Sequence, residues 1–273
     1  MSLPTVIRSR ANPIIKRATA ALAGRERGVL VLEGERLIAD AIGAGAALEL
    51  VLVSDERPEL ARLGDDAAEL RIVAADLLQR VSQLKTSPGV LALCAAPADQ
   101  RPEDWRRDAR SLWLVVAGVS DPGNLGALAR SAEALGAQAL IVTRSAGTEG
   151  GGSGASPWHP RAMRGSMGSL LRLPVATELD AETTASELAR LGVRQVRAAT
   201  RDGNDASEFD WSGPLALWVS GETGRLPGAA RGFEAVSIPM AGRSESLNVT
   251  VATSLLLYAS GRSRPGSTGQ RDG

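Results

Sequence analysis

The pattern of apolar and polar positions divides the chain into two blocks in which helices and strands alternate. In the first block, apolar residues at helical spacing predict helices over 13–22 and 34–42, and a third that Asp76 caps and that extends to Leu84. Short apolar runs predict strands over 29–32, 48–53 and 90–94. Asn12 followed by Pro13 is typical of a cap and the first helical residue. These alternating elements indicate an α/β unit of about a hundred residues.

The second block follows a charged, proline-bearing segment. We expect residues 97–111 to link two domains, 1–96 and 112–262, because this stretch is poor in apolar side chains. The run 112–116 is wholly apolar, as expected for a strand buried on both faces of a parallel sheet. Similar runs predict strands over 139–143, 195–199, 215–219 and 235–238. Helical spacing predicts helices over 124–135, 160–171, 182–191 and 247–259.

Two further segments have the composition of irregular structure. Residues 144–157 are rich in glycine and serine, so we expect a mobile loop. The end of the chain is rich in Gly, Ser, Arg and Pro, and we expect residues 263–273 to form a disordered tail.

Charge is balanced over the whole chain, with 31 basic and 31 acidic residues, so the net charge indicates no partner. Its distribution is more informative, because the first 28 residues carry six basic side chains and one acidic side chain. A basic arm suits phosphate binding, and Arg8, Arg10, Lys16 and Arg17 are therefore candidate RNA contacts. A solvated terminus explains the same charges.

The remaining composition excludes several kinds of site. A single cysteine, Cys94, excludes a disulfide framework within the chain, and with a single histidine, His159, it argues against a Cys- or His-based metal site. Cys94 lies in an apolar run, which predicts a small buried strand residue. No apolar stretch reaches the roughly 20 residues of a membrane span, and no signal-peptide pattern opens the chain. We therefore expect a cytoplasmic protein without metal or membrane partner.

Candidate chemistry is concentrated at three strand-to-loop junctions of the second block, after residues 116, 219 and 238. In open parallel sheets ligands bind at the carboxyl ends of strands. The junction at 118–126 leads into a helix that carries Arg130, and its backbone N–H groups suit an anion. A capping turn explains the same residues, and neither a dinucleotide-binding nor a P-loop glycine pattern fits.

The other two junctions offer polar side chains next to tight turns. Glu222 lies between Gly221 and Gly224, where a carboxylate can receive ligand hydroxyls or orient an arginine; a glycine turn with a capping acid is the alternative. Asn248 stands at a helix start, where it can simply satisfy backbone N–H groups.

An arginine-bearing segment lies between the first and second junctions. Arg161 and Arg164 are three residues apart and share a helix face, with Trp158 and His159 nearby. Such a face can hold phosphate and stack on a base, although a solvated amphipathic helix explains it equally well.

Taken together and in this order, these segments resemble the motifs of the SpoU (TrmH-type) branch of the SPOUT RNA methyltransferases. In this chain, the segment DPGNLGALARSAEALGA resembles the first motif of that family, SGETGRLPG the second and SIPMAGRSESLNVTVATSLLLYA the third. The segment HPRAMRGSMGSLLRLPV resembles the arginine-bearing helix between the first and second motifs. The match covers roughly 112–258. More loosely, the first block is similar to the ribosomal-protein-like substrate-binding domain of many members, on Asn12, Pro13, Lys16 and residues 32–37. The second motif departs from the common Phe-Gly-Ser-Glu pattern at 219–222, where this chain has Val-Ser-Gly-Glu.

The resemblance implies transfer of a methyl group from S-adenosylmethionine (SAM) to a ribose 2′-hydroxyl of RNA. It implies an N-terminal α/β RNA-binding domain, a C-terminal Rossmann-like domain with a deep trefoil knot, and a homodimer whose protomers share the active site. By position it implies catalytic roles for Arg130, Asn124, Glu222 and Asn248. By position it also implies cofactor contacts at Gly221, Glu222, Ile238, Met240, Ser246 and Leu247, and RNA contacts at Arg161 and Arg164.

Within this interpretation Arg130 grips the phosphate beside the target ribose, because a free guanidinium, with a pKa above about 12, is a poor base. Asn124 and Asn248 would bind the ribose, and Glu222 would orient Arg130 or the cofactor. An extra N-terminal domain favours large-subunit ribosomal RNA, since it adds a contact surface for a structured fragment. A tRNA substrate and a non-catalytic RNA-binding protein of the same fold are the alternatives.

Overall fold

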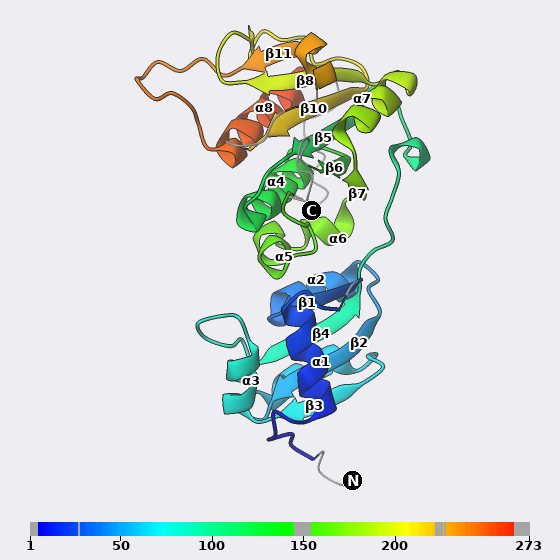
Figure 1. The fold of residues 1–273 in the computed structure, drawn as a ribbon, viewed down its shortest axis with the longest axis vertical. Coiled ribbons are helices and arrows are strands. Elements are labelled where there is room, and N and C mark those ends of the chain that lie inside the picture. The colour runs from blue at the N-terminus through cyan, green and yellow to red at the C-terminus, as the bar shows by residue number, and fades with distance from the viewer. Residues whose placement is uncertain (1–4, 27, 145–153, 222–225, 227, 265–273) are drawn as a thin grey trace, which may run out of the picture. The chain divides into compact units, whose positions relative to one another are not determined.

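The computed structural model describes residues 5–26, 28–144, 154–221, 226 and 228–264. They form two compact units, whose helices and strands are labelled in Figure 1. The first unit comprises residues 1–98 and 158–172, and the second comprises residues 99–157 and 173–273. Both units combine helices with a sheet, which confirms the predicted α/β class. The domain limits 1–96, 97–111 and 112–262 stay predictions.

The first unit is built on a four-stranded sheet in the order β1-β4-β2-β3. Its strands are β1 (Val29–Glu33), β2 (Leu48–Ser54), β3 (Leu70–Val73) and β4 (Val90–Ala95). β4 is antiparallel to β1 and β2, whereas β3 is parallel to β2. Helices α1 (Pro13–Leu22) and α3 (Ala75–Val81) bury their apolar stripes against alternate strand residues such as Leu50, Leu52, Leu91 and Leu93.

Other elements complete this unit. Helix α2 (Glu35–Gly43) packs on β1 and β4, and the 3-10 helix η1 (Pro58–Gly64) packs on β2. Helix α5 (Pro160–Ser166), from a distant part of the chain, packs on β1 and is followed by α6 (Ser169–Arg172). As predicted, Cys94 is a buried residue of β4, and burial raises the pKa of its thiol to about 11.

The start of α1 confirms its predicted cap, whereas the start of α3 differs from the prediction. The Asn12 side chain accepts a hydrogen bond of 2.9 Å from the N–H of Ile14. Asp76 lies inside the first turn of α3, because the N–H of Ala75 already finds an acceptor in the side chain of Asp55 at 2.9 Å. The helix ends at Val81, before the predicted Leu84.

The predicted helix 160–171 is divided into α5 and α6. Met167 and Gly168 have positive φ angles of 50° and 84°, which is the left-handed conformation that ends a helix. An added Cβ at Gly168 would come within 2.9 Å of the Asp40 carboxylate oxygen. Glycine therefore lets this corner approach α2, a packing requirement that helical spacing does not reveal.

The second unit contains a seven-stranded sheet in the order β7-β6-β5-β10-β8-β11-β9. Every neighbouring pair is parallel. The strands are β5 (Leu112–Ala117), β6 (Ala139–Thr143), β7 (Val175–Leu179), β8 (Arg194–Ala199), β9 (Asn204–Asp205), β10 (Leu215–Ser220) and β11 (Glu234–Ser237). The sequence pattern missed β7 and β9, as it missed β3 in the first unit, because these strands are short and lie at sheet edges.

Helices cover both faces of this sheet (Figure 1). Helix α7 (Ala181–Arg190) packs on one face, where Trp113 and Trp218 are fully buried. Helices α4 (Pro122–Ala134) and α8 (Val249–Ser263) pack side by side on the other. The short 3-10 helices η2 (Pro102–Asp104) and η3 (Gly228–Gly232) lie beside α7. None of the helices in the described ranges is long and apolar enough to cross a membrane.

Two segments expected to be irregular lie largely outside the described residues, namely 145–153 and 265–273. The first residues of the expected tail are ordered, because Ser263 belongs to α8 and Arg264 is buried. The guanidinium of Arg264 donates to the carbonyl oxygens of Arg110 at 2.7 Å and Gly213 at 3.0 Å. Two backbone acceptors thus fix the end of α8 in the second unit.

A buried ion pair joins α5 to β1 in the first unit. The side chain of Glu33 is 1 % exposed, and its Oε2 lies 3.3 Å from Nη1 of Arg164, whose side chain is 26 % exposed. The other carboxylate oxygen of Glu33 is buried without a hydrogen-bond partner among the described residues. Arg164 is therefore the group that makes burial of this carboxylate tolerable.

We expect Arg164→Gln to lower the free energy of unfolding by about 3 kcal/mol, because it leaves a buried carboxylate without a counter-ion. Glu33→Gln should cost less, since the partly exposed Arg164 can turn toward water. Denaturant unfolding of each variant and of the double variant measures both costs. Arg62→Gln, which breaks an exposed pair with Glu35, is the control and should cost less than about 1 kcal/mol. Equal costs for Arg164→Gln and Arg62→Gln would contradict this account.

Candidate functional site

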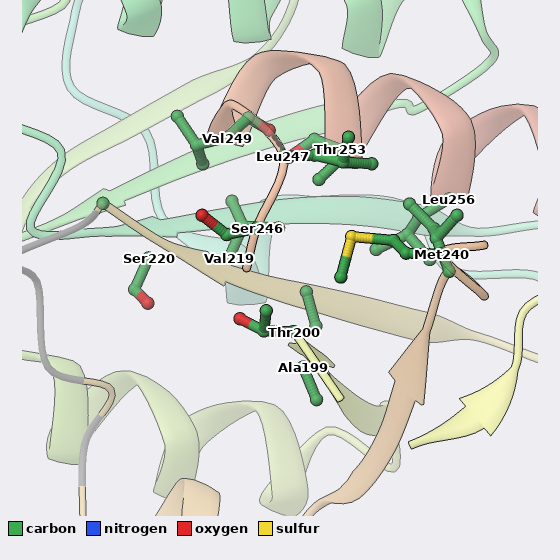
Figure 2. A pocket seen from close by; sticks show the side chains of 14 residues that line it. Ala199, Thr200, Val219, Ser220, Met240, Ser246, Leu247, Val249, Thr253 and Leu256 are labelled. Atoms are coloured by element: carbon green, nitrogen blue, oxygen red, sulfur yellow. Dashed lines mark hydrogen bonds between the residues drawn. The ribbon is translucent and has the colours of Figure 1, made fainter. Parts of the chain in front are cut away.

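The carboxyl ends of β8, β10 and β11 and the first turns of α8 surround a cavity of about 390 Å³ (Figure 2). Parallel pairing places these strand ends at one edge of the sheet, where open α/β sheets bind ligands. The cavity is lined by Ala198, Ala199, Thr200, Val219, Ser220, Gly221, Ile238, Met240, Ser246, Leu247, Val249, Ala252, Thr253 and Leu256. No ionisable side chain is among these described residues, so the part of the wall that the structure describes carries no charge.

Gly221 allows two loops to meet behind the cavity. An added Cβ there would lie 3.0 Å from the carbonyl oxygen of Gly118 and 3.2 Å from Cα of Val119. Any side chain at 221 would therefore push apart the loops that follow β5 and β10. Glycine is favoured at 221 because the backbone of the other loop lies so close, and not because of its φ angle.

The cavity wall combines apolar surface with a few hydroxyl groups. Met240 and Leu256 lie together at one end, and Ser220 lies at the other (Figure 2). Thr200 and Ser246 add hydroxyls between them. Such a wall accepts a flat, largely apolar group and leaves a small number of polar atoms to orient it.

The cavity brings together five of the six residues that the sequence predicts to bind a cofactor. They are Gly221, Ile238, Met240, Ser246 and Leu247. Glu222, the sixth residue and a candidate catalytic residue, lies outside the described residues. The lining therefore agrees with the predicted grouping, and the role of each residue stays a prediction.

Helices α4 and α8 run in the same direction, which places their starts at the same end of the pair. The hydroxyls of Ser131 on α4 and Ser254 on α8 are 2.8 Å apart. Further along both helices, an added Cβ at Gly261 would come 3.8 Å from the carbonyl oxygen of Leu135. Both contacts advance toward the carboxyl ends, so the two N-termini, with their partial positive charge, lie together.

Asn124 and Asn248, two predicted catalytic residues, lie at these helix starts. Asn248 is the N-cap of α8, and its Oδ1 accepts from the N–H groups of Thr250 at 2.9 Å and Val251 at 3.4 Å. The predicted helix start at residue 247 therefore shifts to Val249. The backbone N–H of Asn124 donates to the Asp121 side chain, which caps α4, at 2.8 Å. The structure therefore contains the helix caps that the sequence offered as alternative explanations of the segment 118–126 and of Asn248.

Arg130, the remaining predicted catalytic residue, is exposed on α4 next to Ser131. Within the described ranges the side chains of Arg130 and Asn124 have no hydrogen-bond or ion-pair partner. Neither residue lines the cavity, and Asn248 does not line it either. Asn124 and Asn248 therefore belong to the helix-start end of the α4–α8 pair, whereas Arg130 is the ninth of the thirteen residues of α4. The cavity belongs to the strand ends and the α8 start.

Besides Arg164, two of the predicted RNA contacts lie next to carboxylates in the first unit. Arg8 lies 3.6 Å from Asp55. Arg17 lies 2.5 Å from Glu49 and 2.8 Å from Glu26, and hydrogen bonds to these groups raise its pKa above the ordinary value. Arg17 is thus held by two carboxylates, whereas Arg8, whose side chain is 71 % exposed, has a single and more distant one.

The other predicted RNA contacts differ among themselves. Arg10 and Lys16 are exposed and have no acidic partner among the described residues. Arg161 is exposed at the start of α5, where its backbone N–H donates to Nδ1 of His159 at 3.1 Å. His159 is thus the cap of α5. Arg164 is held by Glu33, as described above.

Sequence reasoning missed the contribution of β8 and of the second turn of α8 to the cavity. Ala198 and Ala199 end β8, and Thr200 follows it directly. The position of β8 next to β10 follows from the sheet order. The rule that ligands bind at carboxyl ends of parallel strands would have included them had that order been known. Thr253 and Leu256 would likewise have been included if the packing of α8 on the sheet had been known.

Comparison with known proteins agrees with this geometry. The SpoU rRNA Methylase family model matches residues 111–258. A 23S rRNA (guanosine(2553)-2′-O)-methyltransferase, RlmP of Bacillus subtilis, is 28 % identical over 230 residues, covering 84 % of this chain and 86 % of the relative. A 23S rRNA (uridine(2479)-2′-O)-methyltransferase of Streptomyces viridochromogenes is 30 % identical over 250 residues, covering 87 % and 84 %.

Solved structures match both units. A crystal structure of an RNA 2′-O ribose methyltransferase has a TM-score of 0.79 and 30 % identity, covering 95 % of this chain and 99 % of that one. The SpoU methyltransferase AviRb of Streptomyces viridochromogenes, in complex with the cofactor AdoMet, has a TM-score of 0.80 and 29 % identity, covering 92 % and 97 %. The family model spans more than half of the sequence, and the chain belongs to the SpoU rRNA methylase family.

Proposed function

We propose that this chain transfers the methyl group of SAM to a ribose 2′-hydroxyl of large-subunit ribosomal RNA. The observation that carries the proposal is the cavity whose wall contains residues of both the second and the third family motif, at Gly221 and at 238–247. Two relatives that match most of this chain are named as 23S rRNA 2′-O-methyltransferases, and a solved relative holds AdoMet. Its substrate would place the protein in the cytoplasm.

The cavity fits the adenosyl part of SAM. Its volume of about 390 Å³ lies within the range of small-molecule sites, which is roughly 300–1,000 Å³. Ile238, Met240 and Leu256 would pack on the adenine, and the hydroxyls of Thr200 and Ser246 would orient the polar groups. When bound, SAM supplies an electrophilic methyl group. What remains for the protein is to align the ribose oxygen and to ease loss of its proton.

Arg130 is suited to the RNA side of the reaction. Its guanidinium is exposed and unpaired among the described residues, so it can fork onto the phosphate beside the target ribose. A fixed positive charge there lowers the cost of removing the hydroxyl proton, because negative charge develops on the oxygen. Arg130 would thus act without taking up the proton itself.

Asn124 and Asn248 would hold the ribose at the common end of α4 and α8. Because Oδ1 of Asn248 caps α8, its amide nitrogen is left as a donor toward the ligand. The amide of Asn124 offers a second contact. Glu222, which lies outside the described residues, is proposed to orient Arg130 or the cofactor on the basis of its motif position alone. Arg161 would contact the RNA backbone.

Replacing Arg130 with Ala should reduce methyl transfer at least about a hundredfold and leave SAM affinity unchanged. Transfer of labelled methyl to deproteinised 23S rRNA, with mapping of the modified ribose, measures this and tests the proposed activity. Arg190→Ala, at an exposed arginine on α7, is the matched control and should retain activity. Transfer to tRNA alone would support the tRNA alternative, and full activity of Arg130→Ala would refute its role.

Replacing Gly221 with Ala should weaken SAM binding about tenfold, because the added methyl group meets the backbone of Gly118 and Val119. Calorimetric titration with SAM, and with S-adenosylhomocysteine in parallel, measures the change. Gly232→Ala is the control, since its added Cβ has nothing within 4 Å. Unchanged affinity in Gly221→Ala would remove this cavity as the cofactor site.

We propose a homodimer and a knotted second unit on the same basis. Val251, Leu255 and Tyr258 form an apolar stripe on α8, at exposures of 49 %, 43 % and 53 %, with the guanidinium of Arg262 6.0 Å from the centre of the Tyr258 ring. A second copy would cover this stripe close to the α8 start. The knot rests on the family resemblance, and an experimental electron-density map of the second unit would test it.

Charging the stripe with Leu255→Asp and Tyr258→Asp should convert the dimer to a monomer. Sedimentation equilibrium measures the mass, and methyl transfer should fall with it if the protomers share the active site. Ile42→Asp, at an exposed apolar residue of the first unit, is the control. A wild-type monomer that transfers methyl groups would exclude this part of the proposal.

A further inference from the structure

The segment 239–247 joins β11 to α8 as a long loop, and both of its ends contribute to the cavity wall (Figure 1). Met240 comes from one end, and Ser246 and Leu247 come from the other. Residues 241–246 are all exposed, and no backbone hydrogen bond links 239–247 to another part of the described chain. The shape of this side of the cavity therefore depends on side chains that hold the segment in place.

One side chain reaches this segment from the end of β8. Arg201 directly follows the cavity residue Thr200, and its Nη2 donates a hydrogen bond of 3.3 Å to the carbonyl oxygen of Ser244. The hydroxyl of Ser244 donates in turn to the carbonyl oxygen of Ser246 at 2.9 Å. Among the described residues, the bond from Arg201 is the only hydrogen bond between 239–247 and the rest of the chain.

The turn that carries Arg201 is itself fixed against β11. The hydroxyl of Ser237, the last residue of β11, donates to the carbonyl oxygen of Gly203 at 3.0 Å. An added Cβ at Gly203 would lie 2.7 Å from the carbonyl carbon of Val236, so the two backbones are in close contact. The preceding Asp202 has a φ angle of 59°, which a residue other than glycine adopts only where its surroundings fix it. Arg201 therefore starts from a rigid backbone.

We propose that Arg201 is a positioning residue for the cofactor, because it holds the segment 239–247 in the conformation that forms one side of the SAM cavity. The inference rests on the proposed function and deepens it. A loop that becomes ordered only on binding loses conformational entropy at that moment, which lowers the affinity. A guanidinium suits the task of holding the loop beforehand, since it is always charged and a charged donor strengthens its bond to a carbonyl oxygen.

Replacing Arg201 with Ala should weaken SAM binding about three- to tenfold, which is the range expected for one hydrogen bond. Calorimetric titration of the full chain with SAM measures the affinity. The KM for SAM should rise by the same factor, whereas kcat at saturating SAM should stay within about twofold of wild type, because bound SAM then orders the segment. Arg201→Lys should recover most of the affinity, since an ammonium group can also donate to the Ser244 carbonyl oxygen.

Trypsin reports the hold on the segment without any ligand. Arg243 is the only trypsin site in 239–247. Cleavage after Arg243, followed by mass spectrometry, should be about three- to tenfold faster in Arg201→Ala than in the wild type, because the freed segment fits the protease more often. The matched control for both measurements is Arg231→Ala, at an exposed arginine of η3 without a hydrogen-bond or ion-pair partner among the described residues.

An unchanged SAM affinity or an unchanged cleavage rate in Arg201→Ala would overturn the proposal. A raised KM for RNA with unchanged SAM affinity would assign Arg201 to the RNA instead. A lowered midpoint of thermal unfolding that Arg201→Lys does not restore would show a general structural role, which also overturns it. Failure of the proposed function is distinguishable, because the wild type would then bind no SAM, whereas failure of this inference alone leaves wild-type binding intact and equal to that of Arg201→Ala.

Discussion

The position of β10 between β5 and β8 is the constraint on which the rest of the second unit depends. Three parallel strands in register end at one edge, and β11 adds a fourth end beside β8. The loops after β5 and β10 then approach so closely that only glycine fits at 221. The cavity exists because this order brings the ends of β8, β10 and β11 together with the start of α8. The described part of its wall carries no charge, as expected next to strands that are buried on both faces.

Much of this arrangement can be predicted from the sequence pattern. The elements and contacts that the pattern did not predict were missed for physical reasons. Long apolar runs and helical spacing located β5, β10, α4 and α8, and motif order grouped five of the cavity residues. Short edge strands carry too little pattern to detect. The break at Met167 depends on the approach of α5 to α2. Periodicity also cannot show that Arg164 meets Glu33, 131 residues away, because no local signal marks a long-range ion pair.

Carboxylates decide which basic residues of the first unit are available to a ligand. The whole chain is neutral, and a count of charges along the N-terminal arm treats its basic residues as equivalent. In the fold, Glu26 and Glu49 hold Arg17, whereas Lys16 and Arg10 line a hollow between α1 and α3 that has no acidic side chain among its described lining residues. The tertiary structure thus gathers positive charge at one place on a chain whose net charge is zero. A local positive potential of this kind attracts a polyanion.

The parallel course of α4 and α8 makes the position of the two asparagines at the helix starts compatible with the ribose contacts proposed for them. Capping fixes the Asn248 side chain, since Oδ1 is held by two backbone N–H groups. Because the oxygen is held, the amide nitrogen of Asn248 points in one fixed direction. The cap therefore orients the N–H donor that a bound ribose would meet in the proposed reaction. Two helix N-termini at the same place add partial positive charge, and Arg130 adds a full charge on α4. In the proposed reaction, an oxygen that becomes negative at the helix starts would meet two helix N-termini and a side chain that its capping bonds already hold.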